Sequence, residues 1–208
     1  MIGSTILRIP ETDSSNNYAA NLLLTKRLTE GIVLVADSQI DGMGQASNKW
    51  ESEPGKNLTF SIVLFPEFLE ISRQFELSKA ISLGVSDYLT ELIDNVSIKW
   101  PNDIYIGNCK VAGILIENSV RLRTISTCIV GIGLNINQQL FLSDAPNPCS
   151  LFQITGKEYD LKESLSDLCL KIDSRYQQLR TGEFRKIDED YSDSLRSEEH
   201  TSELQSQR

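Results

Sequence analysis

Three stretches of the chain repeat their apolar residues at helical spacing. The segment 13–29 opens with cap-type residues at Asp13 to Ser15 and then carries a broad apolar face. The segments 71–93 and 160–180 place their large apolar residues on one stripe of a helix. This pattern predicts three amphipathic helices, of which 71–93 is the longest.

Shorter apolar runs lie between these helices and predict β-strands. Turn sequences bound them: "EPG" precedes the second run, "PND" separates the third run from "IYI", and "IGN" is typical of a hairpin connection. The predicted strands are 32–37, 57–65, 96–100, 110–118 and 124–136. Helices and strands therefore alternate along the chain. This order predicts an α+β (α/β-type) fold in which helices pack on a mixed β-sheet.

Composition narrows the class of protein. A length of 208 residues with 40% hydrophobic and 24% charged residues suits one globular core with at most a small appendage. The net charge of −9 and the pI near 4.7 argue against a broad nucleic-acid surface, which needs a basic field. The four cysteines form no Cys-x-x-Cys pair, and no leader or membrane-length apolar segment is evident. We therefore expect reduced thiols and a cytoplasmic protein.

The C-terminal stretch 196–208 differs from the rest of the sequence. Leu204 is its only large apolar residue, and the composition is typical of a solvated tail. The stretch also looks like a translated adapter sequence, so we exclude it from the fold prediction. His200, the only histidine of the chain, lies there. We consequently predict neither histidine-based catalysis nor a protein metal site.

The segment "KWPNDIYIGNCKVAGILIE" carries the most chemistry. Asn102 and Asp103 follow a predicted strand at a proline turn, where they could accept hydroxyl or N–H hydrogen bonds or hold Mg²⁺ near a nucleotide. Lys110 begins the next strand and would point to the same end of the sheet, where an ammonium stabilises charge that develops in acyl transfer. An ordinary hairpin with solvent-facing polar residues would produce the same local pattern.

Two glycine-containing segments are the other candidates. "GMGQASNKW" at 42–50 has the glycine spacing of a phosphate-binding loop, yet few cations accompany it. In "GIGLNIN" at 131–137, Gly131 and Gly133 interrupt a strongly apolar strand just before Asn135. A glycine inside a strand marks the close approach of a ligand or backbone, or else a bulge or a tight helix contact.

Together these segments resemble biotin–protein ligases over about residues 7–190. "KWPND" followed by the lysine and "GILIE" is the most diagnostic part, and lipoate–protein ligases and octanoyltransferases match it less closely. The motifs that carry the resemblance are "DSSNN" (13–17), "ADSQ" (36–39), "GMGQASNKW" (42–50), "EPGKNLTFS" (53–61), "KWPNDIYIGNCKVAGILIE" (99–117) and "GIGLNIN" (131–137). The resemblance implies a catalytic domain of the class II aminoacyl-tRNA synthetase/biotin ligase type.

The resemblance also implies a two-step reaction. Biotin and ATP, with Mg²⁺, would form biotinoyl-AMP and pyrophosphate, and a lysine of a biotin carboxyl carrier domain would then take the acyl group. Positioning and electrostatics would supply the catalysis, without a covalent enzyme intermediate. The protein would act as a monomer or homodimer. A lipoate- or octanoate-type ligase and a non-catalytic biotin-binding protein are the rival hypotheses.

By position, the resemblance assigns roles to individual residues. Lys110 and Asp103 would be catalytic. Ser14 and Ser15 could cap the helix and also bind the ligand. For Trp50, plain core packing is an equal alternative. The expected biotin-binding residues are Ser14, Ser15, Asn16, Gln39, Gly42, Gly44, Trp50, Lys110 and Gly113. The expected nucleotide-binding residues are Gly42, Gly44, Trp50, Asn102, Asp103 and Asn135.

The sequence departs from the family in its loop. Met43 and Ala46 stand where the family has arginines, and Ser47 replaces a usual glycine. Because hydrogen bonds to charged groups contribute about 1.5–3 kcal/mol each, losing two could weaken adenylate retention by on the order of 10²–10⁴. The protein is then impaired, or Lys49 and Lys56 supply the charge, or the sequence contains an error.

The resemblance also sets the expected domain organisation. We expect a catalytic domain over 1–190, followed at 191–208 by a truncated remnant and a tail that does not look native. The family's N-terminal winged helix-turn-helix domain and C-terminal SH3-like domain have no counterpart in these residues. We therefore expect no binding to operator DNA.

Overall fold

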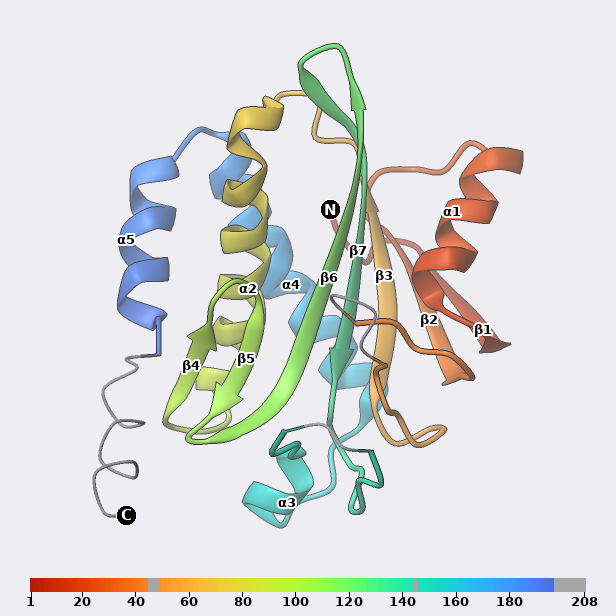
Figure 1. The fold of residues 1–208 in the computed structure, drawn as a ribbon, viewed down its shortest axis with the longest axis vertical. Coiled ribbons are helices and arrows are strands. Elements are labelled where there is room, and N and C mark those ends of the chain that lie inside the picture. The colour runs from red at the N-terminus through yellow and green to blue at the C-terminus, as the bar shows by residue number, and fades with distance from the viewer. Residues whose placement is uncertain (45–48, 144–145, 197–208) are drawn as a thin grey trace, which may run out of the picture.

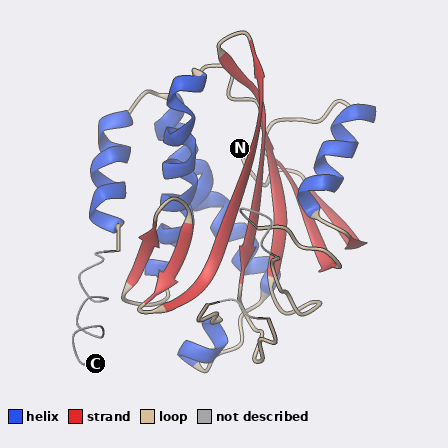
Figure 2. Cartoon of the chain, in the orientation of Figure 1, coloured by secondary structure: helices blue, strands red, loops and turns tan. Residues whose placement is uncertain are grey.

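A computed structural model describes residues 1–44, 49–143 and 146–196. One seven-stranded sheet separates two unequal helical layers (Figures 1 and 2). The strands are β1 (Ile6–Thr12), β2 (Ile32–Gln39), β3 (Leu58–Leu64), β4 (Val96–Lys99), β5 (Asp103–Ile106), β6 (Cys109–Arg121) and β7 (Thr124–Leu134). The helices are α1 (Ser15–Thr25), the short 3₁₀ turn η2 (Ile71–Arg73), α2 (Gln74–Thr90), α3 (Leu151–Thr155), α4 (Leu161–Arg180) and α5 (Phe184–Ser194).

The strands lie in the order β1-β2-β3-β7-β6-β5-β4, and only β1 and β2 pair in parallel. The central strand β3 is buried at all seven residues, which explains its nearly continuous apolar sequence. Strands β6 and β7 form a long hairpin that rises above the rest of the sheet (Figure 1). The mixed sheet predicted from the sequence is therefore confirmed.

One face of the sheet carries most of the core. Helices α2 and α4 pack on it and against each other, and α5 lies outside α2 (Figure 1). Alternate side chains of the central strands point into this layer, as the period of two requires, and among them Phe60, Ile62 and Val130 are fully buried. This buried core keeps the sheet rigid, so residues on the opposite face of the sheet have fixed positions.

The opposite face is divided in two. Helix α1 covers the part nearest its own C-terminal half, where Ile32, Val63 and Ile129 form a small apolar cluster with Ala19. Two and four residues further along the same face of β7, the side chains give way to Gly131 and Gly133. Because glycine has no side chain, the sheet is hollowed beside the start of α1. This hollow is where the candidate site lies.

The predicted elements have counterparts, with changed ends. The first helix stops at Thr25, earlier than predicted, and the predicted helix 71–93 is the 3₁₀ turn η2 followed by α2. The sequence analysis did not predict β1, α3 or α5. Strand β1 is an edge strand with two buried residues, and α5 buries only Ile187 and Tyr191. Helix α5 also runs across residue 190, where we expected the catalytic domain to end.

Candidate functional site

A cavity of about 150 Å³ occupies the hollow beside the start of α1. Described residues from the segment after β2 line it on one side, and residues of β6 and β7 form its base. Its lining residues are Ser14, Ser15, Asn16, Gln39, Met43, Gly44, Lys49, Trp50, Asp103, Lys110, Gly113, Ile114, Leu115, Gly131, Ile132 and Gly133. Most of the predicted biotin-binding residues therefore meet in one cavity.

The start of α1 is held by a side chain from β2. Ser14 occupies the N-cap position, but its hydroxyl makes no capping hydrogen bond, so this hydroxyl is free to face the cavity. The side chain of Gln39 does the capping, because its Oε1 accepts the Ser15 N–H at 2.7 Å. The Gln39 amide is thereby oriented, and its Nε2 donor is left for the cavity.

Asn16 reaches from the first turn of α1 down to the sheet. Its amide lies over Gly131, where a Cβ would come within 2.5 Å of Asn16 Oδ1. Asn16 Oδ1 lies 2.6 Å from Ser61 Oγ on β3, and Ser61 Oγ lies 2.8 Å from Ser15 Oγ. On the other side, Asn16 Nδ2 donates to Glu117 Oε2 at 2.7 Å. A chain of hydrogen bonds thus runs beneath the end of the cavity at the start of α1, which we call the closed end.

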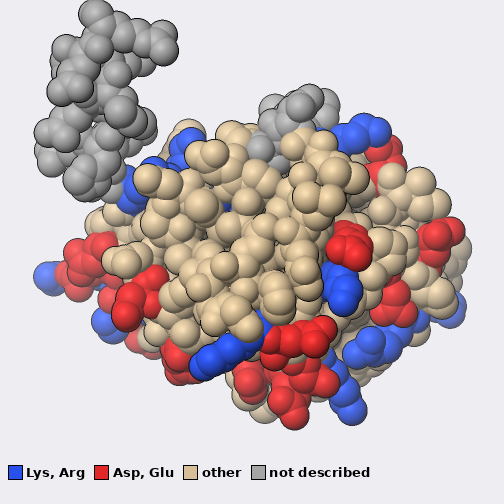
Figure 3. All heavy atoms as spheres, turned by 90° about the horizontal axis from the view of Figure 1, so that it is seen from below, with Lys and Arg blue, Asp and Glu red and all other residues tan. Residues whose placement is uncertain are grey.

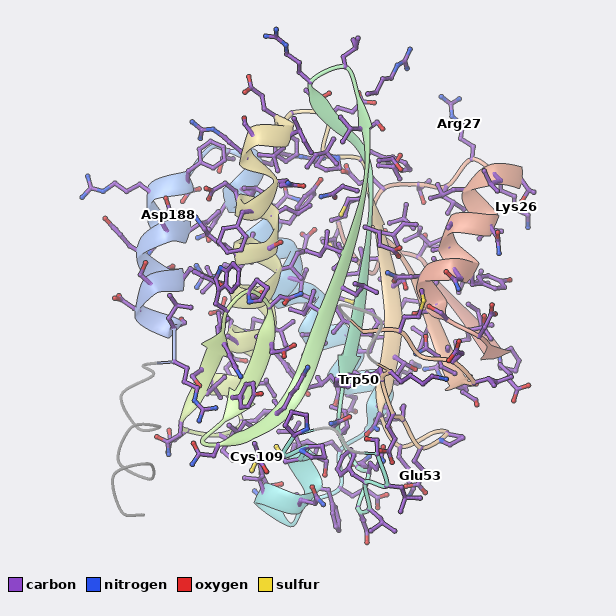
Figure 4. All side chains as sticks on the ribbon, in the orientation of Figure 1. Lys26, Arg27, Trp50, Glu53, Cys109 and Asp188 are labelled. Carbon is purple, nitrogen blue, oxygen red and sulfur yellow. The ribbon has the colours of Figure 1, made fainter. Side chains whose placement is uncertain are left out.

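Two further glycines form a floor for an aromatic ring. The Trp50 indole lies against β6 and β7 (Figure 4), and a Cβ on Gly133 would come within 2.2 Å of Trp50 Cε2. A Cβ on Gly113 would lie 3.0 Å from the same ring. Among the described residues, no group accepts a hydrogen bond from the buried Trp50 Nε1. The indole is therefore a wall of the cavity, with a donor still to be satisfied.

A lysine–aspartate pair lies at the other end of this floor. The register between β5 and β6 shifts at Ile104/Tyr105, and this bulge turns Lys110 to the same side as Gly113. Lys110 Nζ lies 2.7 Å from Asp103 Oδ2 and 5.8 Å from the centre of a Trp50 ring. The ammonium is thus oriented by a carboxylate and an aromatic face.

A second cavity, of about 400 Å³, continues beyond the indole. It shares Lys49, Trp50, Asp103 and Lys110 with the first cavity, and Asn135 lines its inner part. Asn135 Nδ2 donates to the Cys149 carbonyl at 3.0 Å. Its buried Oδ1 has no partner among the described residues. Asn135 therefore presents an acceptor that a ligand amino or hydroxyl group could satisfy.

Glu51 fixes the outer wall of the second cavity. Its carboxylate accepts the backbone N–H groups of Leu142 and Ser143, each at 2.8 Å. Burial acts to raise the pKa of Glu51, but hydrogen bonds from the Ser143 side chain and from these two backbone groups outweigh it. The pKa therefore lies below the ordinary value of 4.5. The wall depends on an ionised Glu51.

The described residues on either side of positions 45–48 lie close together. Met43 pairs with Lys49, and a Cβ on Gly42 would lie 2.6 Å from the Trp50 carbonyl oxygen. Lys49 lines both cavities but forms an ion pair with Asp41 at 2.8 Å. Ala46 and Ser47, two of the three departures from the family sequence, lie outside the described residues.

The other basic residue considered for the site, Lys56, is not among the described residues that line either cavity. Lys56 Nζ lies 3.9 Å from Glu158, near the start of α4. Seen from the end of the molecule that carries α3, charged side chains lie mostly toward the margins of the face (Figure 3). Of the two lysines proposed to replace the missing arginines, Lys49 is thus the one at the cavities.

Two predicted residues have other surroundings. Gly42 supports the hairpin and does not itself line either cavity among the described residues. Asn102 is buried, its Nδ2 donates to the Ile114 carbonyl, and it lines a separate cavity between β6 and α2. Its contact anchors the turn before β5 and so supports Asp103 from behind.

The sequence analysis missed Ser61 and Glu117. The alternation in "LTFSIVL" offered a signal for Ser61, because it places Thr59 and Ser61 on one face of an otherwise apolar strand. Glu117 ends the motif "GILIE", but nothing local indicates its contact with Asn16, which is distant in sequence. Within the described residues there is no group of three or more His, Cys, Asp or Glu able to hold a metal ion. None of the described helices is long and apolar enough to cross a membrane.

Comparison with known proteins relates this geometry to a family. The model of the biotin/lipoate A/B protein ligase family matches residues 8–137. The bifunctional ligase/repressor BirA of Bacillus subtilis is 32% identical over 182 residues, which cover 84% of this chain and 54% of that protein. The biotin–[acetyl-CoA-carboxylase] ligase of Paracoccus denitrificans is 32% identical over 187 residues, 86% of this chain and 76% of that protein.

Comparison with solved structures leads to the same family. The biotin protein ligase from Aquifex aeolicus, solved in complex with biotin and ATP, superposes with a TM-score of 0.79 at 31% identity, covering 92% of this chain and 78% of that one. The class II synthetase-like fold that we expected is thereby confirmed. The chain spans about half the length of the BirA proteins that it matches. With residues 8–137 matching the family model and the fold shared, the chain belongs to the biotin/lipoate A/B protein ligase family.

Proposed function

We propose that the chain is the catalytic domain of a biotin–protein ligase. One observation carries the proposal: a hydrogen-bonding closed end and a lysine–aspartate pair lie at opposite ends of one glycine floor. Biotin has the matching layout, with a polar ureido ring at one end and a carboxylate at the other. Two relatives are named as ligases that use biotin, the biotin–[acetyl-CoA-carboxylase] ligase of Paracoccus denitrificans and the biotin protein ligase from Aquifex aeolicus, and these names support the same substrate.

The closed end favours biotin over lipoate, the other substrate class in the family name. Gln39 Nε2 and the Ser14 hydroxyl face the cavity, and each needs a polar partner when a ligand excludes water. The Ser15 hydroxyl is bonded to Ser61 and keeps a lone pair for a ligand donor. The ureido group supplies N–H donors and a carbonyl acceptor, whereas the dithiolane ring of lipoate supplies only sulfur. A buried polar group left without a partner costs about 1–3 kcal/mol, so several would discriminate strongly against lipoate.

In the first step, a biotin carboxylate oxygen attacks the α-phosphorus of ATP. The bond to the β-phosphate oxygen breaks, and biotinoyl-AMP and pyrophosphate form. Lys110, held by Asp103, stabilises the negative charge that builds on the α-phosphate oxygens. Asn135 Oδ1 accepts from the nucleotide in the second cavity. Mg²⁺ bound with the ATP phosphates would need only one or two protein carboxylates, and Asp103, the ion-pair partner of Lys110, would be one that could hold it.

In the second step, the amine of an acceptor lysine attacks the biotinoyl carbonyl carbon. An amide bond forms, the bond to the phosphate oxygen breaks, and AMP leaves. The Lys110 ammonium stabilises the oxyanion of the tetrahedral intermediate, and the indole of Trp50 shields the mixed anhydride from water. The acceptor would be a biotin carboxyl carrier domain, as the resemblance implies.

Calorimetry combined with product analysis tests the proposal. Biotin, lipoate and octanoate are titrated into the protein with and without ATP·Mg²⁺, and the mixtures are analysed by mass spectrometry. We expect biotin to bind in the absence of ATP, and a biotinoyl-AMP peak to form when ATP·Mg²⁺ is present. Preferential binding of lipoate or octanoate would overturn the substrate assignment.

A second function, biotin binding without chemistry, is favoured by one observation. Met43, at a position where the family has an arginine, lines the biotin cavity. Its thioether cannot donate a hydrogen bond to a phosphate or carboxyl oxygen. Biotin binding without any biotinoyl-AMP peak would support this function over the ligase.

A further inference from the structure

We infer that Glu117 is a positioning residue that sets the direction of the hydrogen bonds beneath the biotin cavity, and so makes the Ser15 hydroxyl an acceptor for a ligand N–H group. The inference rests on the proposed function. It concerns a side chain on the solvent-exposed part of β6 that does not itself line the cavity among the described residues.

The first step is the orientation of Asn16. An ionised carboxylate can only accept hydrogen bonds, so Glu117 Oε2, at 2.7 Å, requires the amide nitrogen of Asn16 on its side. The Leu115 carbonyl, 3.4 Å from Asn16 Nδ2, makes the same demand more weakly. A flipped amide would place oxygen against two acceptors. Asn16 Oδ1 must therefore face Ser61.

The second step is the placement of the hydroxyl hydrogens. Ser61 has one hydroxyl hydrogen, and Asn16 Oδ1, an acceptor only, lies 2.6 Å from its oxygen. Ser61 therefore donates to Asn16. The remaining contact, 2.8 Å between the oxygens of Ser61 and Ser15, must then use the hydrogen of Ser15. All three residues are buried, so bulk water offers few alternative partners.

The third step is what the cavity presents. With its hydrogen directed at Ser61, the Ser15 hydroxyl has only lone pairs left for a ligand. Gln39 Oε1 is occupied by the Ser15 N–H, so Gln39 presents its Nε2 donor. An acceptor beside a donor matches the N–H and C=O of one edge of a ureido ring. Reversing the chain at Glu117 would set the Ser15 O–H against a ligand N–H.

Three variants test the direction of the chain by biotin calorimetry. Glu117→Gln keeps an acceptor for Asn16 and should bind biotin within about threefold of the original protein. Glu117→Lys offers only donors, favours the flipped amide and should weaken biotin binding by about tenfold, the scale of one inverted hydrogen bond. Adding Asn16→Asp to Glu117→Lys restores an acceptor-only group at position 16. This double variant should recover at least half of the loss on a logarithmic scale.

Controls separate this effect from charge and from folding. Ser119→Lys adds a positive charge at an exposed site one pleat further along β6 and should leave the affinity for biotin unchanged. If Glu117→Lys lowers the melting temperature sharply, Glu117→Met replaces it, with an expected loss smaller than that of Lys. Biotin affinity of Glu117→Lys within twofold of the original protein, or a double variant no better than Glu117→Lys, would overturn the inference. Failure of the original protein to bind biotin would instead overturn the proposed function.

Discussion

The two ends of the cleft differ in how completely their polar groups are satisfied. At the closed end, Ser15, Asn16 and Ser61 are joined to one another and to Glu117 by hydrogen bonds. At the open end, Trp50 Nε1 and Asn135 Oδ1 are buried without a partner among the described residues. The closed end is built from a helix start and sheet strands, whereas Trp50 and Asn135 at the open end lie outside the strands.

This difference indicates an order of assembly. A satisfied network on rigid elements is already in its binding geometry, so little reorganisation opposes the first ligand. An unpaired buried group costs about 1–3 kcal/mol, and a ligand that supplies its partner recovers part of that cost. We therefore expect biotin to meet a preformed site, and the nucleotide to complete the second one.

The largest effect should come from removing the charge that the two cavities share. Lys110→Met deletes the ammonium beside Asp103 and should lower the rate of biotinoyl-AMP formation by about 10²–10³, the usual cost of losing one preorganised electrostatic group. Biotin affinity, set at the closed end, should change much less. Single-turnover assays with mass spectrometry and calorimetry measure the two quantities separately.

Lys171→Met is the matched control, because Lys171 also forms an ion pair, with Glu91, but lies between α4 and α2. It should leave both quantities unchanged. Equal loss in the two variants would mean that Lys110 acts through stability alone.

Two glycines allow the ends to be disturbed one at a time. Gly131→Ala places a Cβ within 2.5 Å of Asn16 Oδ1 and should weaken biotin binding by about 10–100-fold, the equivalent of overpacking by 1–3 kcal/mol. Gly133→Ala places a Cβ within 2.2 Å of Trp50 Cε2 and should displace the indole instead. Its main effect should be faster loss of the adenylate, with a smaller change in biotin affinity.

Tryptophan fluorescence distinguishes these outcomes. In a Trp100→Phe background, which removes the exposed second tryptophan, Gly133→Ala should shift the emission of Trp50 to the red, while Gly131→Ala should not. A red shift in both variants would show that the two ends are coupled, contrary to the comparison.

Much of the fold and many of the site residues could be predicted from the sequence, for local reasons. The run that forms β3 and the run 128–134 of β7 are nearly continuously apolar because both faces of the central strands are largely buried there. Gly131, Gly133, Lys110 and Asp103 stand in motifs whose residue types and order already indicate a ligand. Each of these signals lies within one short stretch of the sequence.

The rest depends on contacts between distant parts of the chain. Glu117 acts on Asn16, about a hundred residues away, and neither residue alone indicates that contact. Alternation along β6 would place Lys110 on the helix-covered face, and only the bulge returns it to the cleft. Strand β1 and helix α5 bury too few residues to leave a clear pattern. Such features follow from tertiary packing, which the spacing of apolar residues along the sequence does not show.

Restoring cations to the loop at 42–50 should strengthen retention of the adenylate. The double variant Met43→Arg with Ala46→Arg adds two donors where the family has arginines, so release of biotinoyl-AMP should slow by about tenfold or more, the effect of roughly one charged hydrogen bond. Met43→Arg alone should account for part of this, since Met43 lines the first cavity. Stopped-flow or filter assays of adenylate release measure it, and an unchanged off-rate would contradict the role given to the loop.

The smallest effect concerns the wall that Glu51 holds. Because the pKa of Glu51 is lowered in the folded protein, its ionised form adds stability that is complete above pH 4.5 and is lost as the pH falls through the lowered pKa. Glu51→Gln should therefore reduce the free energy of unfolding by about 1 kcal/mol or less at pH 7, since the site is partly solvated. The difference should shrink below pH 4. Glu53→Gln, at an exposed carboxylate two residues along (Figure 4), is the matched control and should leave the free energy of unfolding at pH 7 unchanged. Parallel denaturant titrations at pH 7 and pH 3.5 would measure how much stability Glu51→Gln loses. An equal loss at both pH values would show that the ionised Glu51 carboxylate does not hold the wall.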